Sequence, residues 1–224
     1  MAIEAGLTPE ARAAFIAQET SVLPVPHVPE IRLHVAHEAI SLWQRTEDEL
    51  EAMGLPPPFW AFAWAGGQGL ARYVLDHPEV VAGKRVLDFA SGSGLVAIAA
   101  MMAGASACEG AEIDEFAIEA IGLNAALNGV SVSPRLGDVI GIDDGWDVIL
   151  AGDVCYEQGM ASRVIGWLER LQERGASVLI GDPGRSYLPK ARLEECATYM
   201  VKTVGALEDN EIKKTCVWRL IPQG

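Results

Sequence analysis

The segment Lys84-Arg85-Val86-Leu87-Asp88-Phe89-Ala90-Ser91-Gly92-Ser93-Gly94 decides the fold of this chain. Its first half predicts a buried strand over residues 85–89, and its second half is a loop of small residues that leads into an apolar helix over 94–104. Small residues let a ligand approach the backbone, and the N-terminus of the following helix offers unpaired N–H groups. This order of elements is typical of the ligand-binding edge of an α/β sheet.

Strands and helices alternate on the C-terminal side of this loop. The expected strands lie at 107–112, 132–136, 146–151 and 177–180, and the expected helices at 115–128 and 159–173. The alternation predicts an α/β fold with a doubly wound, Rossmann-like parallel sheet. Residues 198–204 and 214–221 favour two further strands, which predicts a terminal antiparallel hairpin.

The first 58 residues lack this alternation. Thr8-Pro9 predicts a helix start, and the helix is expected to run to about residue 18. The prolines at 24, 26 and 29 favour an extended path, and the alternation over 31–35 predicts a short strand. A second helix is expected over 46–53 and ends at Gly54. We therefore expect an N-terminal extension over 1–58 packed on one domain over 59–224.

Composition excludes several classes of function. The 224 residues include 17 Lys and Arg against 31 Asp and Glu, a net charge of −14 that disfavours nucleic acid and favours a basic protein partner. No stretch predicts a membrane helix, and the N-terminus lacks the pattern of a signal or mitochondrial presequence, so we expect a cytoplasmic protein. The four cysteines have no metal-ligand or redox spacing, so no metal is expected.

Two carboxylates suggest which ligand the small-residue loop binds. Glu112 ends the second strand, twenty residues after Gly92, where an acid can bind ribose hydroxyls. Gly92-x-Gly94-x-x-Ala97 formally matches a dinucleotide fingerprint. Asp88, however, would repel a pyrophosphate and attract an ammonium group. S-adenosylmethionine carries an ammonium and a sulfonium and has no phosphate, so the sequence favours it over a nicotinamide cofactor.

Asp138 and Val139 follow the third strand and are candidates for contact with an adenine ring. The Asp138 carboxylate could accept a hydrogen bond from the adenine amino group, with Val139 against the ring. The alternative is a solvated acid in a turn.

An acid and a tyrosine follow the fourth strand in Gly152-Asp153-Val154-Cys155-Tyr156. Methyl transfer to an amine needs a neutral nitrogen, and removing the proton from a lysine at pH 7 costs about 4–5 kcal/mol. We expect Asp153 to capture and align the amine and Tyr156 to pack against it. Asp153 is expected at the solvent edge, so replacing it should leave the fold intact.

Two further segments leave their roles open. Residues 58–68, which include Trp64, are rich in aromatics and then in glycine, and predict either core plus a helix start or a lid over a cation. Gly181-Asp182-Pro183-Gly184-Arg185 predicts a tight turn that either borders the substrate entrance or is only a turn.

These motifs together resemble a known family. Asp88-x-x-x-Gly92-x-Gly94 is similar to the first motif of seven-strand S-adenosylmethionine-dependent methyltransferases, and Asp153-x-x-Tyr156 resembles the D-x-x-Y motif of their protein-lysine branch. With the Trp64-x-Gly66-Gly67-Gln68 and Gly181–Arg185 segments, residues 56–221 resemble the lysine methyltransferases of the electron-transfer flavoprotein β subunit. Ala90 replaces a glycine usual in the first motif.

The resemblance implies a protein-lysine methyltransferase that uses S-adenosylmethionine and modifies the electron-transfer flavoprotein β subunit. It implies Asp153 and Tyr156 as the catalytic residues. The expected cofactor-binding residues are Trp64, Asp88, Ala90, Gly92, Gly94, Glu112, Asp138 and Val139. A ribosomal protein or a small amine is the alternative substrate. A nicotinamide-dependent oxidoreductase and a non-catalytic binding module are the alternative classes.

Overall fold

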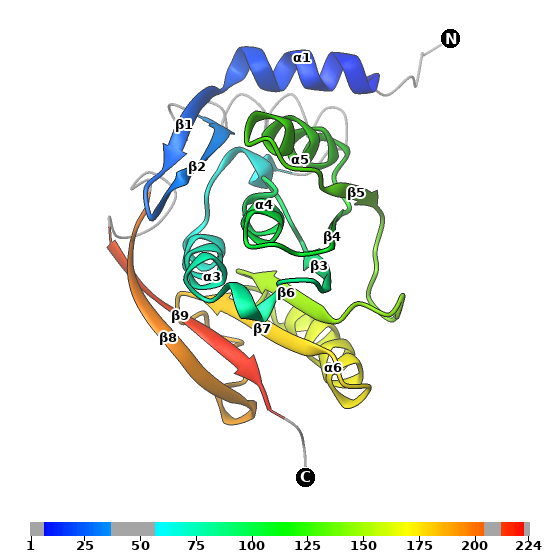
Figure 1. Cartoon of the computed structure of the whole chain (residues 1–224), viewed down its shortest axis with the longest axis vertical. Helices are drawn as coiled ribbons and strands as arrows, with labels where there is room; N and C mark the ends of the chain where they lie inside the picture. The colour runs from blue at the N-terminus through cyan, green and yellow to red at the C-terminus, as the bar shows by residue number, and fades with distance from the viewer. Residues whose placement is uncertain (1–6, 37–56, 204–211, 222–224) are drawn as a thin grey trace.

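A seven-stranded sheet forms the centre of the protein. The computed structural model describes residues 7–36, 57–203 and 212–221. The strands are β3 (Arg85–Phe89), β4 (Ala107–Glu112), β5 (Ser133–Leu136), β6 (Val148–Gly152), β7 (Ser177–Asp182), β8 (Leu193–Lys202) and β9 (Ile212–Leu220). Their order is β5-β4-β3-β6-β7-β9-β8 (Figure 1). The first five are parallel, whereas β9 runs antiparallel to both β7 and β8.

Helices cover both faces of this sheet. Figure 1 shows α3 (Ala65–Asp76), α4 (Leu95–Met102) and α5 (Glu115–Leu127) on one face and α6 (Gln158–Glu173) on the other. Neighbouring residues of one strand face opposite layers: Val86 belongs to the core under α3 and α4, and Leu87 to the core under α6. Burial on both faces explains why the central strands are continuously apolar in sequence.

The predicted α/β architecture and terminal hairpin are confirmed, with element ends shifted by few residues. One difference is β8, which begins at Leu193 rather than at 198. Its added part contains the exposed Glu194 and Glu195 and ends in a register shift before Ala197, so its sequence resembles a polar loop. The other is α3, which was expected only as a helix start, one of two alternatives for residues 58–68; its glycines at 66, 67 and 69 weaken the helical signal.

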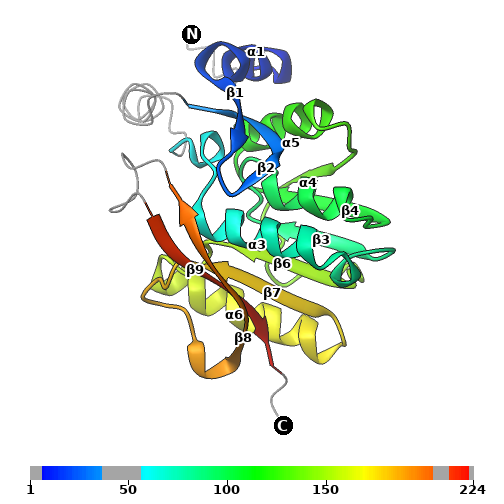
Figure 2. The same ribbon diagram turned by 60° about the vertical axis from the view of Figure 1, so that its left-hand side comes forward.

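The described part of the N-terminal segment packs on the sheet domain. Helix α1 (Pro9–Glu19) lies across α5, and β1 (Ser21–Val25) and β2 (Val28–Val35) form a separate hairpin (Figure 2). Thr8 caps α1, as expected. Arg12 pairs with Glu115 of α5 at 2.6 Å. The helix expected at 46–53 lies outside the described residues, and the boundary at residue 58 stays a prediction.

No helix in the described ranges is both long and apolar enough to cross a bilayer.

Candidate functional site

The loop after β3 has the backbone conformation of a ligand cradle. Ala90, Gly92 and Gly94 have φ values of 53°, 54° and 82°, in the left-handed region. Glycine adopts this conformation without strain, whereas alanine pays a steric cost. The alanine in place of the usual glycine therefore keeps the loop but strains it.

Asp88 lies beneath this loop. Its side chain accepts hydrogen bonds from the Ser91 hydroxyl and from the Ala97 amide, the latter at 3.0 Å, and the residue is 1% exposed. Burial raises the pKa of Asp88 to about 7, while the two hydrogen bonds oppose that rise. In the structure these two hydrogen bonds fasten the loop to α4, and the contact with an ammonium group that the sequence predicted stays a prediction.

Glu112 joins the end of β4 to the same loop. One carboxylate oxygen accepts the Gly92 amide hydrogen at 2.7 Å, and the other accepts that of Ile113 at 3.0 Å. Burial raises the pKa of Glu112. Burial also raises the pKa of Asp114, at the N-cap of α5, to about 6. The carboxylate lies where a ribose-binding acid is expected.

Ile113 is a candidate that the sequence reasoning missed. It is 71% exposed although it is a large apolar side chain, and it directly follows Glu112. The exposed Leu136 ends β5 and pairs in register with Glu112. Two apolar side chains beside an acid suit a ring with a sugar attached. An apolar residue after the acid at a strand end is the signal that could have found it.

The electrostatics of the cradle exclude a phosphate-rich ligand. Between Arg85 and Arg135 the sequence contains no Lys or Arg. The acids at or next to the loop are Asp88, Glu112 and Asp114, whereas Glu109 pairs with Arg135 at the opposite edge of the sheet and Glu115 pairs with Arg12. Such a field attracts a cation and repels phosphates. The residues present therefore fit S-adenosylmethionine, as the sequence predicted, and do not fit a dinucleotide.

Asp138 and Val139 occupy a turn and the core. Asp138 accepts the Ile140 amide hydrogen at 2.9 Å and pairs with Arg163 at 3.0 Å, with both side chains largely exposed. Val139 is 2% exposed and belongs to the core under α6. These contacts are those of a solvated acid in a turn, which was the alternative interpretation of Asp138. Contact with an adenine ring stays a prediction for both residues.

An aromatic cluster connects the segment before α3 with Tyr156, on the side of the site where the methyl-accepting lysine is expected (the acceptor side). Trp64 precedes α3 and donates its indole N–H to the Phe59 carbonyl at 2.9 Å. The Phe59 ring lies 6.0 Å from Trp64 and 6.4 Å from Tyr156, which is half exposed. Trp60 and Phe62, by contrast, are buried. The segment thus serves as core at two positions and as a partly exposed aromatic wall at Phe59 and Trp64.

Asp153 is not at the solvent edge, so that expectation was wrong. Its side chain is 12% exposed and its φ is 57°. One carboxylate oxygen accepts the Gly67 amide hydrogen at 3.0 Å, and the other accepts an Arg185 guanidinium hydrogen at 3.0 Å. Burial raises the pKa of Asp153 to about 6, and the Arg185 charge opposes the rise.

The turn after β7 delivers Arg185 to this carboxylate. The buried Asp182 accepts the amide hydrogens of Gly184 and Arg185, both at 2.7 Å. This fixes the turn so that the arginine side chain folds back over Asp153. The Gly181–Arg185 segment is therefore part of the candidate site, which the sequence left open.

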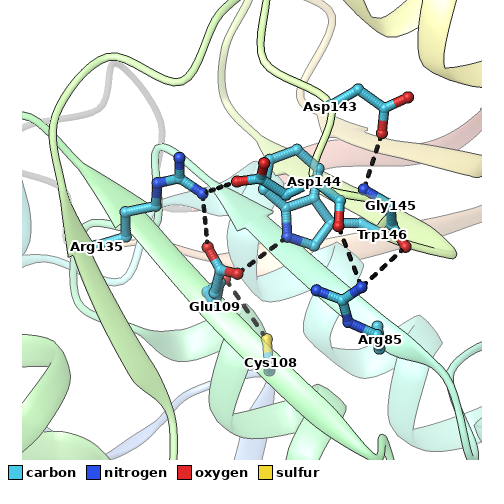
Figure 3. Close-up of polar contacts among 8 residues, drawn as sticks. All are labelled: Arg85, Cys108, Glu109, Arg135, Asp143, Asp144, Gly145 and Trp146. Atoms are coloured by element: carbon cyan, nitrogen blue, oxygen red, sulfur yellow. Dashed lines mark hydrogen bonds and ion pairs between the residues drawn. The ribbon is translucent and has the colours of Figure 1, made fainter.

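A separate cavity of about 320 Å³ lies at the opposite, amino ends of β3, β4 and β5. Figure 3 shows that its polar groups bind one another: Arg135 pairs with Glu109 at 3.1 Å, and the Trp146 indole donates to Glu109 at 3.3 Å. Arg85 donates to the Asp144 carbonyl at 3.1 Å. The network fastens the turn before β6, so this cavity is not the candidate active site.

Solved methyltransferases share this fold. Magnesium protoporphyrin IX methyltransferase from Synechocystis PCC 6803, solved with bound SAM, superposes with a TM-score of 0.53 at 16% identity, over 69% of this chain and 78% of that one. A putative RNA methyltransferase from Pyrococcus horikoshii superposes with a TM-score of 0.56 at 15% identity, over 80% of this chain and 98% of that one. At these identities the likeness shows the fold alone.

Similarity in sequence is closer and extends over the acceptor side. The ribosomal protein L11 methyltransferase (PrmA) family matches residues 72–152. The electron transfer flavoprotein beta subunit lysine methyltransferase of Xenopus laevis is 38% identical over 216 residues, which cover 93% of this chain and 87% of the relative. The Homo sapiens protein of that name is 35% identical over 224 residues, 96% of this chain and 84% of the relative. This chain belongs to the electron transfer flavoprotein beta subunit lysine methyltransferase family.

Proposed function

We propose that this protein transfers methyl groups from S-adenosylmethionine to lysine side chains of the electron transfer flavoprotein β subunit. The observation that carries the proposal is identity along almost the whole chain to relatives of that name, at 38% over 93% of its residues. The alignment extends beyond the cofactor loop to the segments around Asp153 and Arg185, which are expected to bind the methyl-accepting lysine.

S-adenosylmethionine, when bound, supplies a methyl group on a positively charged sulfur. The residues that would hold it are the Ala90–Gly94 loop and Glu112, with Ile113 and Leu136 against the adenine ring. Asp88 keeps the loop in shape from below. Ionised acids around the cradle stabilise the positive charge of the donor.

The acceptor lysine would enter beside Tyr156 and Phe59. Their partly exposed rings lie 6.4 Å apart, centroid to centroid, and can together contact one side of the aliphatic stem of a lysine while they exclude water from the nitrogen. Asp153, whose carboxylate pairs with Arg185, would accept a hydrogen bond from the amine and orient it toward the cradle. Because a displacement at carbon needs a free nitrogen lone pair, orientation and loss of one proton are the two requirements on this side.

The acidic surface favours a basic patch on the partner. A net charge of −14 attracts lysine-rich surfaces over long range and speeds encounter. Salt weakens that attraction, because the Debye length falls from about 10 Å at 0.1 M to about 3 Å at 1 M.

The test offers purified electron transfer flavoprotein, purified ribosomal proteins and free lysine side by side with labelled S-adenosylmethionine, at low and high salt. We expect label on the β subunit, with a rate that falls as salt is added. Free lysine should be a poor substrate at either salt concentration. Equal turnover of free lysine, or no label on the flavoprotein, would contradict the proposal.

Methylation of a ribosomal protein is the second candidate, because the L11 methyltransferase family matches residues 72–152. That match ends at Gly152, immediately before Asp153, and so covers the cofactor-binding half. It supports shared cofactor chemistry more than a shared protein substrate. Label on ribosomal protein alone would reverse this order.

A further inference from the structure

We propose that Arg185 is a positioning residue of the methyl-transfer site, and that its ion pair with Asp153 keeps an incoming lysine from being held as an unreactive ammonium ion. The inference rests on the proposed function and adds a residue to its mechanism. It starts from a geometric fact: one Asp153 oxygen is already engaged by Arg185 at 3.0 Å and the other by the Gly67 amide at 3.0 Å.

The ion pair is built into the fold. Asp182 is fully buried and binds the amides of Gly184 and Arg185, which directs the Arg185 side chain back over β6. Both members of the pair are mostly shielded from solvent, with side chains 26% and 12% exposed. A shielded pair on a fixed turn is less screened by salt than a surface ion pair.

The charge of Arg185 reaches the other titratable groups at this edge of the sheet. It acts to lower the pKa values of Asp153, Asp182, Cys155 and Tyr156, all of which burial raises. Glu112 acts on Tyr156 from the cofactor side with the opposite sign, and Lys190 acts on Asp182 with the same sign as Arg185. Helix α3 contributes the Gly67 amide to the carboxylate.

This arrangement resolves a conflict in the chemistry. Transfer forms an N–C bond at the lysine nitrogen and breaks the C–S bond of the donor, whose electron pair stays on sulfur, and one lysine proton goes to solvent. A bare carboxylate beside the lysine would raise the lysine pKa and oppose that proton loss. Asp153 paired with Arg185 can still accept a hydrogen bond from the amine, but the pair carries no net charge that retains the proton.

The experiment measures single-turnover methylation of purified electron transfer flavoprotein between pH 7 and 9.5 by the wild-type protein, Arg185→Gln and Arg185→Lys. If desolvation brings the pKa of the bound lysine to about 9 in the wild-type complex and removing the Arg185 charge raises it by about one, Arg185→Gln is about tenfold slower at pH 7 and about threefold slower at pH 9.5. Arg185→Lys keeps the charge and should stay within about threefold of wild type throughout. The KM for the flavoprotein should not rise in Arg185→Gln.

A purely structural role would give a different pattern. A deficit in Arg185→Gln that is equal at every pH, or an Arg185→Lys variant as slow as Arg185→Gln, would overturn the inference. Thermal unfolding and S-adenosylhomocysteine affinity that match wild type show that the variants are folded.

A second arm separates this inference from the proposed function. n-Butylamine is titrated into each protein with S-adenosylhomocysteine present at pH 7. Arg185→Gln should bind it about tenfold more tightly than wild type, because the unpaired carboxylate favours the ammonium form. Equal affinities would overturn the role of Arg185. An unmethylated flavoprotein with the expected butylamine difference would instead overturn the assigned substrate.

Discussion

The carbonyl oxygen of Gly66 lies so close to Gly181 that a Cβ atom on Gly181 would come within 2.1 Å of it. The contact is reciprocal, since a Cβ on Gly66 would lie 2.3 Å from the Gly181 oxygen and 2.5 Å from the Asp153 carboxylate. The contact holds the start of α3 against the end of β7, so that the Gly67 amide points toward Asp153. Two glycine-containing motifs that are far apart in sequence therefore pack directly against each other.

Replacing either of these glycines should destabilise the protein strongly. We expect Gly181→Ala and Gly66→Ala each to lower the free energy of unfolding by about 3 kcal/mol, since backbone must move to admit the methyl group. Gly67→Ala is the matched control. Its Cβ would meet only Val96 and Leu95, at 3.9 and 4.0 Å, so it should be neutral or stabilise α3 by up to about 1 kcal/mol. Urea unfolding measures all three, and equal losses would contradict the contact.

Two substitutions in the loop after β3 should change the stability of the protein in opposite directions, because both positions have a left-handed φ but only Ala90 carries a Cβ atom. Ala90→Gly should raise the free energy of unfolding by about 1 kcal/mol, because glycine adopts a φ of 53° without steric cost. Gly92→Ala should lower it by a similar amount, since φ is 54° there and the nearest atom to the new Cβ, the Phe59 oxygen, is 4.0 Å away. Urea unfolding again provides the measurement. Changes of the same sign would show that contacts, not backbone strain, decide the outcome.

The sheet could be predicted from sequence because parallel strands buried on both faces are continuous apolar runs, as in residues 148–151. The small-residue loop and Glu112 could be placed because the loop follows β3 and Glu112 ends β4. Helix α3 was harder to predict, because its glycines weaken the helical signal while they allow close contact with the sheet, as Gly66 does with Gly181 of β7 and Gly69 with Thr215 of β9.

The surroundings of Asp153 on the acceptor side could not be predicted, because they depend on tertiary contacts that the spacing of residues in the sequence does not encode. Asp153 is an acid after a strand in sequence, which is typical of an exposed residue. Its burial follows from Arg185, 32 residues further on, and from the Gly67 amide, 86 residues earlier. Val139 packs in the core under α6, which the sequence did not predict, because the direction of a turn residue depends on backbone geometry that periodicity does not fix; its contact with adenine stays a prediction.

Asp153 should tolerate asparagine better than alanine. Asparagine can still accept the Gly67 hydrogen bond and adopts a φ of 57° readily, whereas alanine leaves the buried amide and Arg185 without their partner. We expect Asp153→Ala to lower the free energy of unfolding by about 2–3 kcal/mol and Asp153→Asn by less than about 1.5 kcal/mol.

Both Asp153 variants should lose most methyl transfer, since neither balances the charge of Arg185 or offers the amine a carboxylate oxygen. Thermal unfolding and the single-turnover rate are measured on the same samples. A stable, fully active Asp153→Asn protein would remove the carboxylate charge from the mechanism.

The network at the amino ends of the strands should affect stability alone. Arg135→Gln removes the ion pairs to Glu109 and Asp144, which are partly exposed, and should cost no more than about 1 kcal/mol. Methyl transfer should not change, because these residues lie at the amino ends of the strands, at the edge of the sheet opposite the candidate site. A loss of rate without a loss of stability would mean that this cavity takes part in function.

The affinity for S-adenosylmethionine should rise with pH. In the free protein, burial raises the pKa of Asp88 to about 7 and that of Asp114 to about 6, so both bind protons in the range where a cationic ligand favours their ionised forms. Binding must then release protons. We expect affinity to increase about tenfold between pH 5.5 and 8 and to level off above pH 8. Calorimetry in buffers of different ionisation enthalpy measures the released protons.

Asp88→Asn is the variant that tests this coupling. A buried acid whose pKa is raised above its unfolded value of about 4 destabilises the fold as pH rises from 4 to 7, because the native state binds the proton more tightly. Asparagine carries no such charge and can still accept the Ala97 hydrogen bond, so the free variant should be at least as stable as wild type at pH 8.

The Asp88→Asn variant should bind S-adenosylmethionine more weakly than wild type at pH 8. Its affinity should lose the part of the pH dependence centred near 7, while the part centred near 6 remains. S-adenosylhomocysteine, which lacks the sulfonium charge, should show a shallower pH dependence in both proteins. An affinity that rises on acidification, or a variant with an unchanged pH profile, would show that the charge of Asp88 is not coupled to the ligand.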